Sequence, residues 1–567
     1  MHARTTETFS ENKHSRLIIL GLDGATFDLI SPWAEQGKLP HTARLMQEGC
    51  WGPLRTVIPP STAVAWNSFA SGKGPARHGL FEFMRRRQNS YRLEPVNSDE
   101  VQSGRLWDFM AFHGRPSIIL NLPISYPVRP INGCMVAGLP VPNEGPHRCH
   151  PENLIAELEQ VAPGYKLLPA ISFTGNNEAE YLADLQNTLK CKILAARHLL
   201  RNRPWELFVQ VFSETDFSMH SFWRYLDQAH SKFRPEDHAR FGEAVLSIYR
   251  LIDEFIGELR RDYPHVPLMM VSDHGFGPLE YYIYNNAWLL REGFLRPRNN
   301  LRSRLKYAAF KMGFNPSNVF AFINRIGLSQ VKRKVKGTQT GYGLVEKVFF
   351  SFPDIDWRGS QAYALGGGIA GLIFLNVKGR EPEGAVQPGT EYEAVRNEIM
   401  ARLREFRDAR TGEKIVGEIY KREELFEGPF AENGPDLVYF PRDPRYIVFS
   451  SFSFSSHQII RDPGHYITGQ HRMDGIFFMH GAKVKSGMRL QHARIIDAAP
   501  TALYLMGHPI PNDMDGKVLV EGIKEEAVRR QPVDSMEFEY NKNGESMAYS
   551  EADRAEVEAR LKSLGYL

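Results

Sequence analysis

The chain has 567 residues and a mass of 64.7 kDa, long enough for several structural units. Its composition, 42% hydrophobic and 24% charged, is that of a folded globular protein and excludes a disordered, collagenous or coiled-coil chain. The formal net charge of +3 produces no overall field that would favour nucleic acid as a partner.

The cysteines and the first residues predict a cytoplasmic protein. The cysteines stand at positions 50, 134, 149 and 191 and form no C-x-x-C pair, so we expect neither a zinc ribbon nor a redox motif. Residues 1–15 are polar and charged and lead directly into an apolar run, which is not the pattern of a signal peptide. No apolar stretch reaches the roughly 20 residues that a membrane-spanning helix needs.

Short apolar runs that end in acidic or glycine-rich turns alternate with helical patterns along the chain. The apolar positions of residues 240–261 recur at helical spacing and predict a crossover helix. This alternation predicts an α/β fold with a mostly parallel sheet flanked by helices. The strand-like runs are residues 16–22, 117–121, 207–212, 267–271 and, late in the chain, 475–480.

The pattern changes after residue 290, which predicts an inserted lid subdomain between two parts of one core. A strand-like run at 372–377, a helix at 391–407 and a second strand-like run at 436–440 indicate a small α+β unit. A helix at 496–506 belongs to the returning core, and a last helix is expected at 551–564. The predicted segments are a first core part at 1–290, a basic insertion at 291–345, the lid at 346–445, a second core part at 446–520 and a C-terminal linker and helix at 521–567.

Acidic and imidazole side chains follow several of the predicted strands. Each has an ordinary explanation as a helix cap or a solvated residue. The carboxyl ends of parallel strands meet at one edge of a sheet, however, so we expect these side chains to converge there. Imidazole and carboxylate are the ligands of zinc-type ions. The candidates are Asp23, Asp216 and His220 (one helical turn apart), Asp273 and His274, and His471 on a predicted loop. The set is large enough to bind two metal ions.

A hydroxyl group is predicted at the start of a helix in Pro59-Pro-Ser-Thr-Ala-Val-Ala-Trp66. Either Ser61 or Thr62 stands at the N-cap, where its simplest role is to cap the helix. The helix terminus favours negative charge, and a neighbouring metal ion would lower the hydroxyl pKa further. A nucleophilic role is therefore the alternative interpretation.

These residues occur in an order and context that resemble the alkaline phosphatase superfamily, most closely its type I phosphodiesterase/nucleotide pyrophosphatase branch. The stretch from Pro59 to Gly79 is similar to the nucleophile segment of that family, and its alignment on His78-Gly79 puts the nucleophile at Thr62. The likeness extends from residue 16 to 519, and its further motifs are Asn286-Ala-Trp-Leu289, Gly379-Arg-Glu381, Asp497-Ala-Ala-Pro-Thr501 and Met514-Asp-Gly516.

The resemblance implies an alkaline-phosphatase-like core and a two-metal phosphoester hydrolase, with two zinc ions as the usual occupants and manganese as an alternative. It implies a covalent phosphothreonine intermediate on Thr62, which water then releases. The substrate would be a small phosphoester. The implied ligands are Asp216, His220 and His471 for one ion, and Asp23, Asp273 and His274 for the other, with Thr62 beside the second ion.

One position departs from the family pattern. Nucleotide pyrophosphatases have an asparagine three residues after the nucleophile, and here that position is Ala65. Asn67 is the nearby candidate for substrate binding, although it comes five residues after Thr62 and so lies about 140° away from it around the helix. Because no arginine closely follows Thr62, a diester substrate is favoured over a monoester. A phosphomonoesterase or a phosphomutase on the same core is the alternative enzyme.

The segment Gly293 to Val345 supports a hypothesis of another class. It contains 11 Lys or Arg residues and no Asp or Glu. Its apolar positions could form amphipathic helices that bind an anionic membrane surface or another anionic partner. The alternatives are a solvated or core-packed lid and electrostatic steering of an anionic substrate. The sequence leaves the oligomeric state open.

Overall fold

The computed structural model describes residues 16–87, 89–319, 347–450, 454–464, 466–540, 547 and 549–564. Residues 320–345 of the predicted basic insertion therefore lie outside the described residues. The same holds for 541–546, 548 and 565–567 of the predicted C-terminal part.

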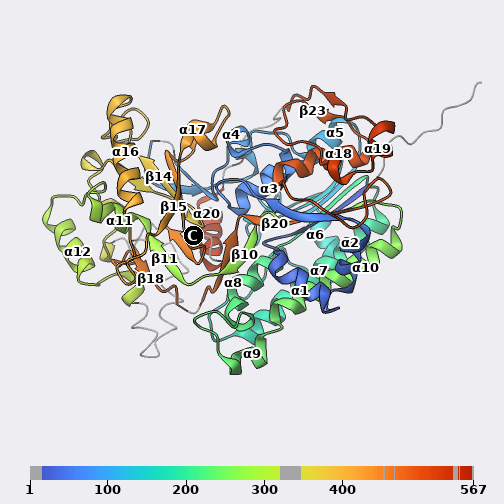
Figure 1. Cartoon of the computed structure of the whole chain (residues 1–567), viewed down its shortest axis with the longest axis horizontal. Coiled ribbons are helices and arrows are strands. Elements are labelled where there is room, and N and C mark those ends of the chain that lie inside the picture. The colour runs from blue at the N-terminus through green and yellow to red at the C-terminus, as the bar shows by residue number, and fades with distance from the viewer. Residues whose placement is uncertain are drawn as a thin grey trace, which may run out of the picture.

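A large sheet forms the centre of the molecule, in the order β21-β2-β20-β9-β1-β8-β5-β6-β7, with β22 paired to β2 (Figure 1). The neighbours β9, β1, β8, β5 and β6 run parallel, whereas β20 is antiparallel to both β9 and β2. The sheet is thus mostly parallel, as the sequence predicts. Its strands are β1 (Leu17–Leu22), β2 (Cys50–Arg55), β5 (Ser117–Leu122), β6 (Gly133–Ala137), β7 (Cys149–His150), β8 (Leu207–Phe212), β9 (Leu268–Val271), β20 (Asp474–His480), β21 (Met488–Arg489) and β22 (Ala493–Arg494).

Helices cover both faces of this sheet. On one side lie α3 and α18, and on the other lie α7, α8 and α10 (Figure 1). Every residue of β1, β5 and β8 is buried, which is typical of strands covered on both faces. The helices of the core are α1 (Phe27–Glu35), α2 (Pro40–Glu48), α3 (Thr62–Ser71), α4 (Pro75–His78), α5 (Leu106–Phe112), α6 (Leu154–Val161), α7 (Glu178–Asn202), α8 (Glu214–Leu226), α9 (Pro235–Phe241), α10 (Ala244–Asp262) and α18 (Ala498–Met506).

The predicted crossover helix at 240–261 is shorter than expected at its start. Gly242 caps the C-terminus of α9, and its amide donates to the carbonyl of His238. The chain then enters α10 at Ala244, so the apolar pattern of the prediction spans the end of one helix and all of the next.

Two smaller four-stranded sheets and their helices form a second hydrophobic core (Figure 1). One sheet has the order β12-β14-β16-β15 and is antiparallel, and the other has the order β13-β17-β11-β18. Their elements are β11 (Tyr281–Tyr284), β12 (Ala362–Ala364), β13 (Gly367–Gly368), β14 (Gly371–Leu375), β15 (Val416–Lys421), β16 (Leu437–Pro441), β17 (Tyr446–Phe449), β18 (Ile460–Arg461), α11 (Asn285–Glu292), α12 (Leu301–Lys311), α16 (Thr390–Arg404) and α17 (Arg422–Leu425). This core takes in Ile283 and Tyr446, from just outside the predicted insertion and lid.

Short two-stranded sheets and a last helix complete the described chain. The strands β10 (Gly275–Pro278) and β19 (Gly469–Arg472) form an antiparallel pair, and β10 is the next strand after β9 in the chain. The predicted final helix is present as α20 (Glu551–Leu564). The remaining elements are β3 (Met84–Arg86), β4 (Leu93–Pro95), β23 (Ile510–Pro511), β24 (Ser535–Met536) and α19 (Glu525–Arg530). Among the helices described here, none combines the length and the apolar character needed to cross a bilayer.

Candidate metal centre

Three adjacent parallel strands deliver most of the predicted ligands to one place. The strands β9, β1 and β8 are neighbours in the sheet, and their carboxyl ends lie at the same edge. Asp23 directly follows β1, Asp216 lies in the first turn of α8 after β8, and Asp273 follows β9. Open α/β sheets bind their ligands at such an edge.

His471 reaches the same place by a different route from the predicted loop. It lies within β19, where it pairs with Phe276 of β10. The strand β10 begins directly after His274, so this antiparallel pairing brings His471 against the end of β9. The rings of His274 and His471 stack with their centroids 3.5 Å apart.

The first group of ligand atoms consists of Asp216, His220 and His471. Asp216 Oδ1 lies 3.4 Å from His220 Nε2 and 3.3 Å from His471 Nε2, and the two nitrogens are 3.2 Å apart. Four ligands placed tetrahedrally about 2.0–2.1 Å from a zinc ion would be roughly 3.3 Å from each other. The three atoms therefore have the spacing of one face of a zinc site.

The second group consists of Asp23, Asp273 and His274. His274 Nε2 lies 3.6 Å from Asp23 Oδ1 and 3.2 Å from Asp273 Oδ2, and one ligand atom from each residue lies within 4.8 Å of the others. His274 is also within that distance of Asp216 and His471, so it stands between the two groups.

Hydrogen bonds orient the imidazole rings. His220 Nδ1 bonds to the carbonyl of Gly469 at 2.9 Å, and His274 Nδ1 bonds to the carbonyl of Gly275 at 3.1 Å. A carbonyl can only accept, so each Nδ1 carries a proton, and in the neutral ring the lone pair available for a ligand bond is then on Nε2. Such partners are typical of histidines that bind metal.

The carboxylates are held by the turns that follow the strands. Asp273 Oδ1 accepts a hydrogen bond from the amide of Gly24 at 3.1 Å, and Thr215 Oγ1 donates to the carbonyl of Asp23 at 2.6 Å. Gly24 has φ = +70°, and a Cβ there would lie 2.9 Å from the ring of Phe276. Glycine is therefore required in this turn.

The electrostatics of the second group fit a cation. Asp23 and Asp273 are completely buried, and neither forms an ion pair with a lysine or arginine among the described residues. Neither oxygen of Asp23 has a hydrogen-bond partner there, nor has Asp273 Oδ2. Burial, together with the neighbouring carboxylates, raises the pKa of Asp23 well above its usual value, and burial raises the pKa of Asp273 to about 7. Buried carboxylates without a counter-charge are costly, and bound metal ions would supply that charge.

The first group is arranged to keep one carboxylate charged and its histidines neutral. Burial lowers the pKa of His471 to about 3 and also lowers that of His220, so both rings are neutral near pH 7. Burial alone would raise the pKa of Asp216, but His220 and His471 hold it below its usual value. Neutral imidazoles and an ionised carboxylate are the forms that bind metal.

Thr62 lies beside the second group, at the first residue of α3. Its hydroxyl oxygen is 3.2 Å from His274 Nε2, and its side chain is completely buried. Ser61 occupies the N-cap position, and its hydroxyl donates to Glu82 Oε1 at 2.8 Å. Of these two hydroxyls, Thr62, to which the family resemblance assigns the nucleophile, is the one that contacts the cluster of candidate ligands.

Among the described residues, the side-chain amide of Asn67 forms its hydrogen bond within its own helix. Its side-chain amide donates to the carbonyl of Ala63 at 2.8 Å, one turn earlier in α3. Its predicted contact with substrate remains a prediction.

A buried ion pair that was not predicted from the sequence lies next to the first group. Lys192 Nζ lies 2.8 Å from Glu214 Oε1, and both side chains are buried. Glu214 begins α8, two residues before Asp216. Lys192 shares one side of α7 with Leu185, Leu189 and Leu199. A lysine on the apolar side of a helix indicates a buried acidic partner, and this pattern could have predicted the ion pair from the sequence.

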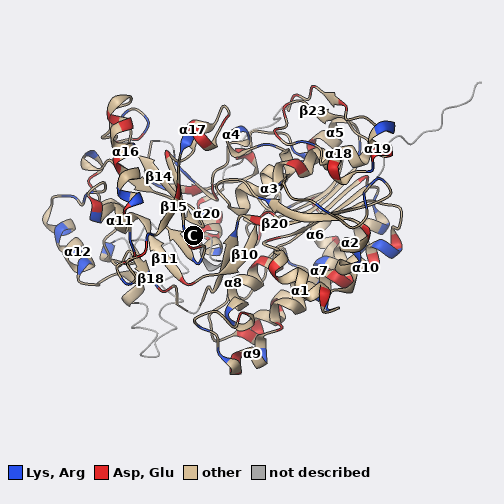
Figure 2. Cartoon of the chain, viewed as in Figure 1, with Lys and Arg blue, Asp and Glu red and all other residues tan. Residues whose placement is uncertain are grey.

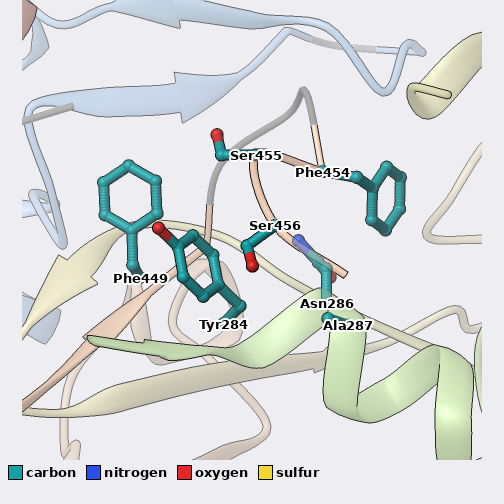
Figure 3. A pocket seen from close by; sticks show the side chains of 7 residues that line it. All are labelled: Tyr284, Asn286, Ala287, Phe449, Phe454, Ser455 and Ser456. Carbon is teal, nitrogen blue, oxygen red and sulfur yellow. The ribbon is translucent and has the colours of Figure 1, made fainter. Parts of the chain in front are cut away.

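A separate small hollow lies away from the ligand cluster. Figure 3 shows its lining, and none of the predicted ligands contributes to it. The side chain of Asn286 bonds to both the amide and the carbonyl of Ala364, which accounts for this residue structurally. The lining residues are Tyr284, Asn286, Ala287, Phe449, Phe454, Ser455 and Ser456.

The sequence matches the family of type I phosphodiesterases and nucleotide pyrophosphatases over residues 17–482. The chain belongs to this family. It is accordingly a metal-dependent phosphoric ester hydrolase with the alkaline-phosphatase-like fold that the sequence predicts. No curated protein matches the sequence.

Two of the solved structures that resemble this chain are a hydrolase and an ectonucleotide pyrophosphatase / phosphodiesterase. Phosphonoacetate hydrolase from Sinorhizobium meliloti 1021, in complex with phosphonoacetate, gives a TM-score of 0.51 at 15% identity, with 87% of this chain and 96% of that chain covered. An inactive form of murine ectonucleotide pyrophosphatase / phosphodiesterase 5, in complex with AMP, gives a TM-score of 0.47 at 11% identity, with coverage of 90% and 100%. At these identities the similarity to the hydrolase shows the fold alone.

Proposed function

We propose that this phosphodiesterase-family chain is a two-metal phosphodiesterase or nucleotide pyrophosphatase that acts through a covalent intermediate on Thr62. The observation that carries the proposal is the position of the Thr62 hydroxyl, 3.2 Å from His274 Nε2 and hence beside six clustered ligand residues. Thr62 is the first residue of α3 and Ser61 occupies the N-cap position, so the Thr62 hydroxyl does not stand where a capping side chain would.

Zinc suits the mixture of imidazole and carboxylate ligands, and manganese is the alternative. Asp216, His220 and His471 would hold one ion, and Asp23, Asp273 and His274 the other. When bound, two such ions would lower the pKa of the threonine hydroxyl and neutralise charge on the phosphoryl group.

The chain's own groups would then position and attack the substrate. Thr62 Oγ, having lost its proton, would attack phosphorus as the alkoxide, the bond from phosphorus to the leaving alcohol or nucleotide would break, and the leaving oxygen would take up a proton. Water would next hydrolyse the phosphothreonine and restore the hydroxyl. The N-terminus of α3 points its partial positive charge toward the developing anion. Burial of Thr62 keeps bulk water from the attacking oxygen.

Parallel assays of the zinc- or manganese-loaded protein test this proposal. The substrates are a bis-aryl phosphate, an aryl phosphate, a dinucleotide with a pyrophosphate bond and a glycerophosphodiester. We expect the diesters or the dinucleotide to turn over fastest. Faster turnover of the aryl monoester would favour the phosphomonoesterase alternative.

Thr62→Ala, with Thr62→Ser as its matched control, tests the covalent step. We expect the alanine variant to lose about 10³-fold or more in turnover, and the serine variant to keep measurable activity. Both should keep the folding and metal content of the parent. An alanine variant with unchanged turnover would exclude Thr62 as the nucleophile.

A further inference from the structure

The helix α12 has an apolar stripe that points into solvent. The side chains of Leu301 and Leu305 are 76% and 62% exposed, and Met312, directly after the helix, is 82% exposed. Positions 301, 305 and 312 fall on one side of a helix because they are spaced by four and seven residues. The opposite side packs into the protein through the buried Ser303 and Phe310. The helix therefore carries apolar side chains on both sides, and the leucines of its outward side are exposed.

Basic side chains flank this stripe. At 100° per residue, Arg304 and Lys311 lie on one side of it and Arg302 on the other, and all three are exposed. Lys306 points inward instead, to Asp354 at 2.9 Å. Figure 2 shows α12 at one end of the molecule with basic residues along it. The surrounding segment, residues 293–345, contains no acidic residue in its sequence.

A basic cavity lies beside the N-terminus of α12. Its volume is ≈ 350 Å³. The carboxylate of Asp354, in its wall, already bonds to Ser303 and Lys306. Arg298 and Arg302 each donate a hydrogen bond to a backbone carbonyl. A carbonyl carries no net charge, so this bond does not neutralise the guanidinium groups. The lining residues are Arg298, Asn300, Arg302, Ser303, Lys306, Lys347, Pro353 and Asp354. The cavity is thus suited to an anion such as a phosphate group.

We propose that α12 docks this protein onto an anionic membrane surface. The leucines and Met312 would enter the boundary between headgroups and acyl chains, the flanking cations would contact lipid phosphates, and the cavity would accept a headgroup phosphate. Stable attachment to a membrane surface takes two signals, and α12 supplies an apolar and an electrostatic one. An anionic membrane surface is favoured because residues 293–345 contain no acidic residue, so every charged side chain of the segment is attracted to lipid phosphates.

The test measures co-sedimentation of the full chain with vesicles. One set contains phosphatidylcholine alone, and the other also contains phosphatidylglycerol, each at low and high salt. We expect binding to the anionic vesicles only, and weaker binding at high salt. Leu305→Ser combined with Met312→Ser should reduce binding about tenfold or more. Arg302→Gln combined with Arg304→Gln should reduce it about 25-fold, at roughly fivefold for each charge.

Matched controls come from other helices. Leu194→Ser removes an exposed leucine from α7, and Arg529→Gln with Arg530→Gln removes two exposed charges from α19, at the other end of the molecule (Figure 1). These variants should bind vesicles as the parent does, and circular dichroism should show that every variant is folded. The proposal is overturned by absence of binding to anionic vesicles, by equal binding to neutral ones, or by α12 variants that bind like the controls. Self-association through α12 without vesicle binding would also overturn it, in favour of a second copy as the partner.

Discussion

Replacement of Asp273 by asparagine should stabilise the metal-free protein although it removes a metal ligand. Asp273 is completely buried, and burial raises the pKa of its carboxyl group to about 7. An asparagine can keep the bond in which Oδ1 accepts from the Gly24 amide. Near pH 8 the parent must bury a charge that the variant does not carry.

The size of the effect follows from the two pKa values. The carboxyl group titrates at 3.8 in an unfolded chain and at about 7 in the folded, metal-free protein. The folded state therefore binds the proton more tightly, and stability falls as the pH rises from about 4 to about 7. The cost of ionisation amounts to about 4 kcal/mol at pH 8 and about 2 kcal/mol at pH 5. The variant escapes this cost, so its advantage should be about twice as large at pH 8.

Urea unfolding with a chelator or with saturating zinc, at pH 8 and pH 5, measures both effects. With zinc the parent should gain stability and the variant should gain little, because the ligand is lost. Asp253→Asn is the matched control. The Asp253 carboxylate accepts hydrogen bonds from Thr42 and from the His41 amide, so this variant should be less stable than the parent with or without metal. If the metal-free Asp273→Asn protein is less stable than the parent at pH 8, the buried carboxylate of Asp273 does not destabilise the metal-free fold.

Three further predictions concern the support of the site and its metal. Gly21→Ala should cost about 1–3 kcal/mol and lower turnover, because a Cβ there would lie 2.4 Å from the ring of Trp66, on the helix that bears Thr62; unchanged unfolding and kcat would contradict this. Lys192→Met should cost about 3–5 kcal/mol in urea unfolding by leaving Glu214 buried without its partner, and adding Glu214→Gln should recover much of that loss. If the double variant is no more stable than the single one, the ion pair is not the cause. Chelation should abolish phosphoester hydrolysis and lower the Tm, and added zinc should restore both; full activity in metal-free protein would argue against a metal mechanism.

Local patterns carried much of the fold prediction. The runs before Asp23 and Asp273 are continuous apolar stretches, which is how strands buried on both faces read in a sequence. The end of each of these strands could be predicted separately from its own apolar run. Because β9, β1 and β8 are parallel neighbours in the sheet, their carboxyl ends lie next to each other in the fold. The spacing of Asp216 and His220 fixes their common side of a helix wherever that helix lies.

Long-range pairing explains what local patterns could not supply. His471 was expected on a loop, and its place in β19 depends on antiparallel pairing with β10, a strand far away in the sequence. The helix-start pattern alone did not distinguish Ser61 from Thr62, because their different partners, Glu82 for Ser61 and His274 for Thr62, come from later in the chain. The apolar residues of α12 lie on both sides of the helix, so the sequence left open which side faces the protein; core packing decides that.

Anomalous diffraction at the zinc edge from zinc-loaded crystals would show whether two metal ions bind in this cluster beside Thr62. We expect two peaks, one contacted by Asp216, His220 and His471 and the other by Asp23, Asp273 and His274, with the Thr62 hydroxyl beside the second. No peak among these side chains, or a single peak at exposed surface residues, would contradict this expectation.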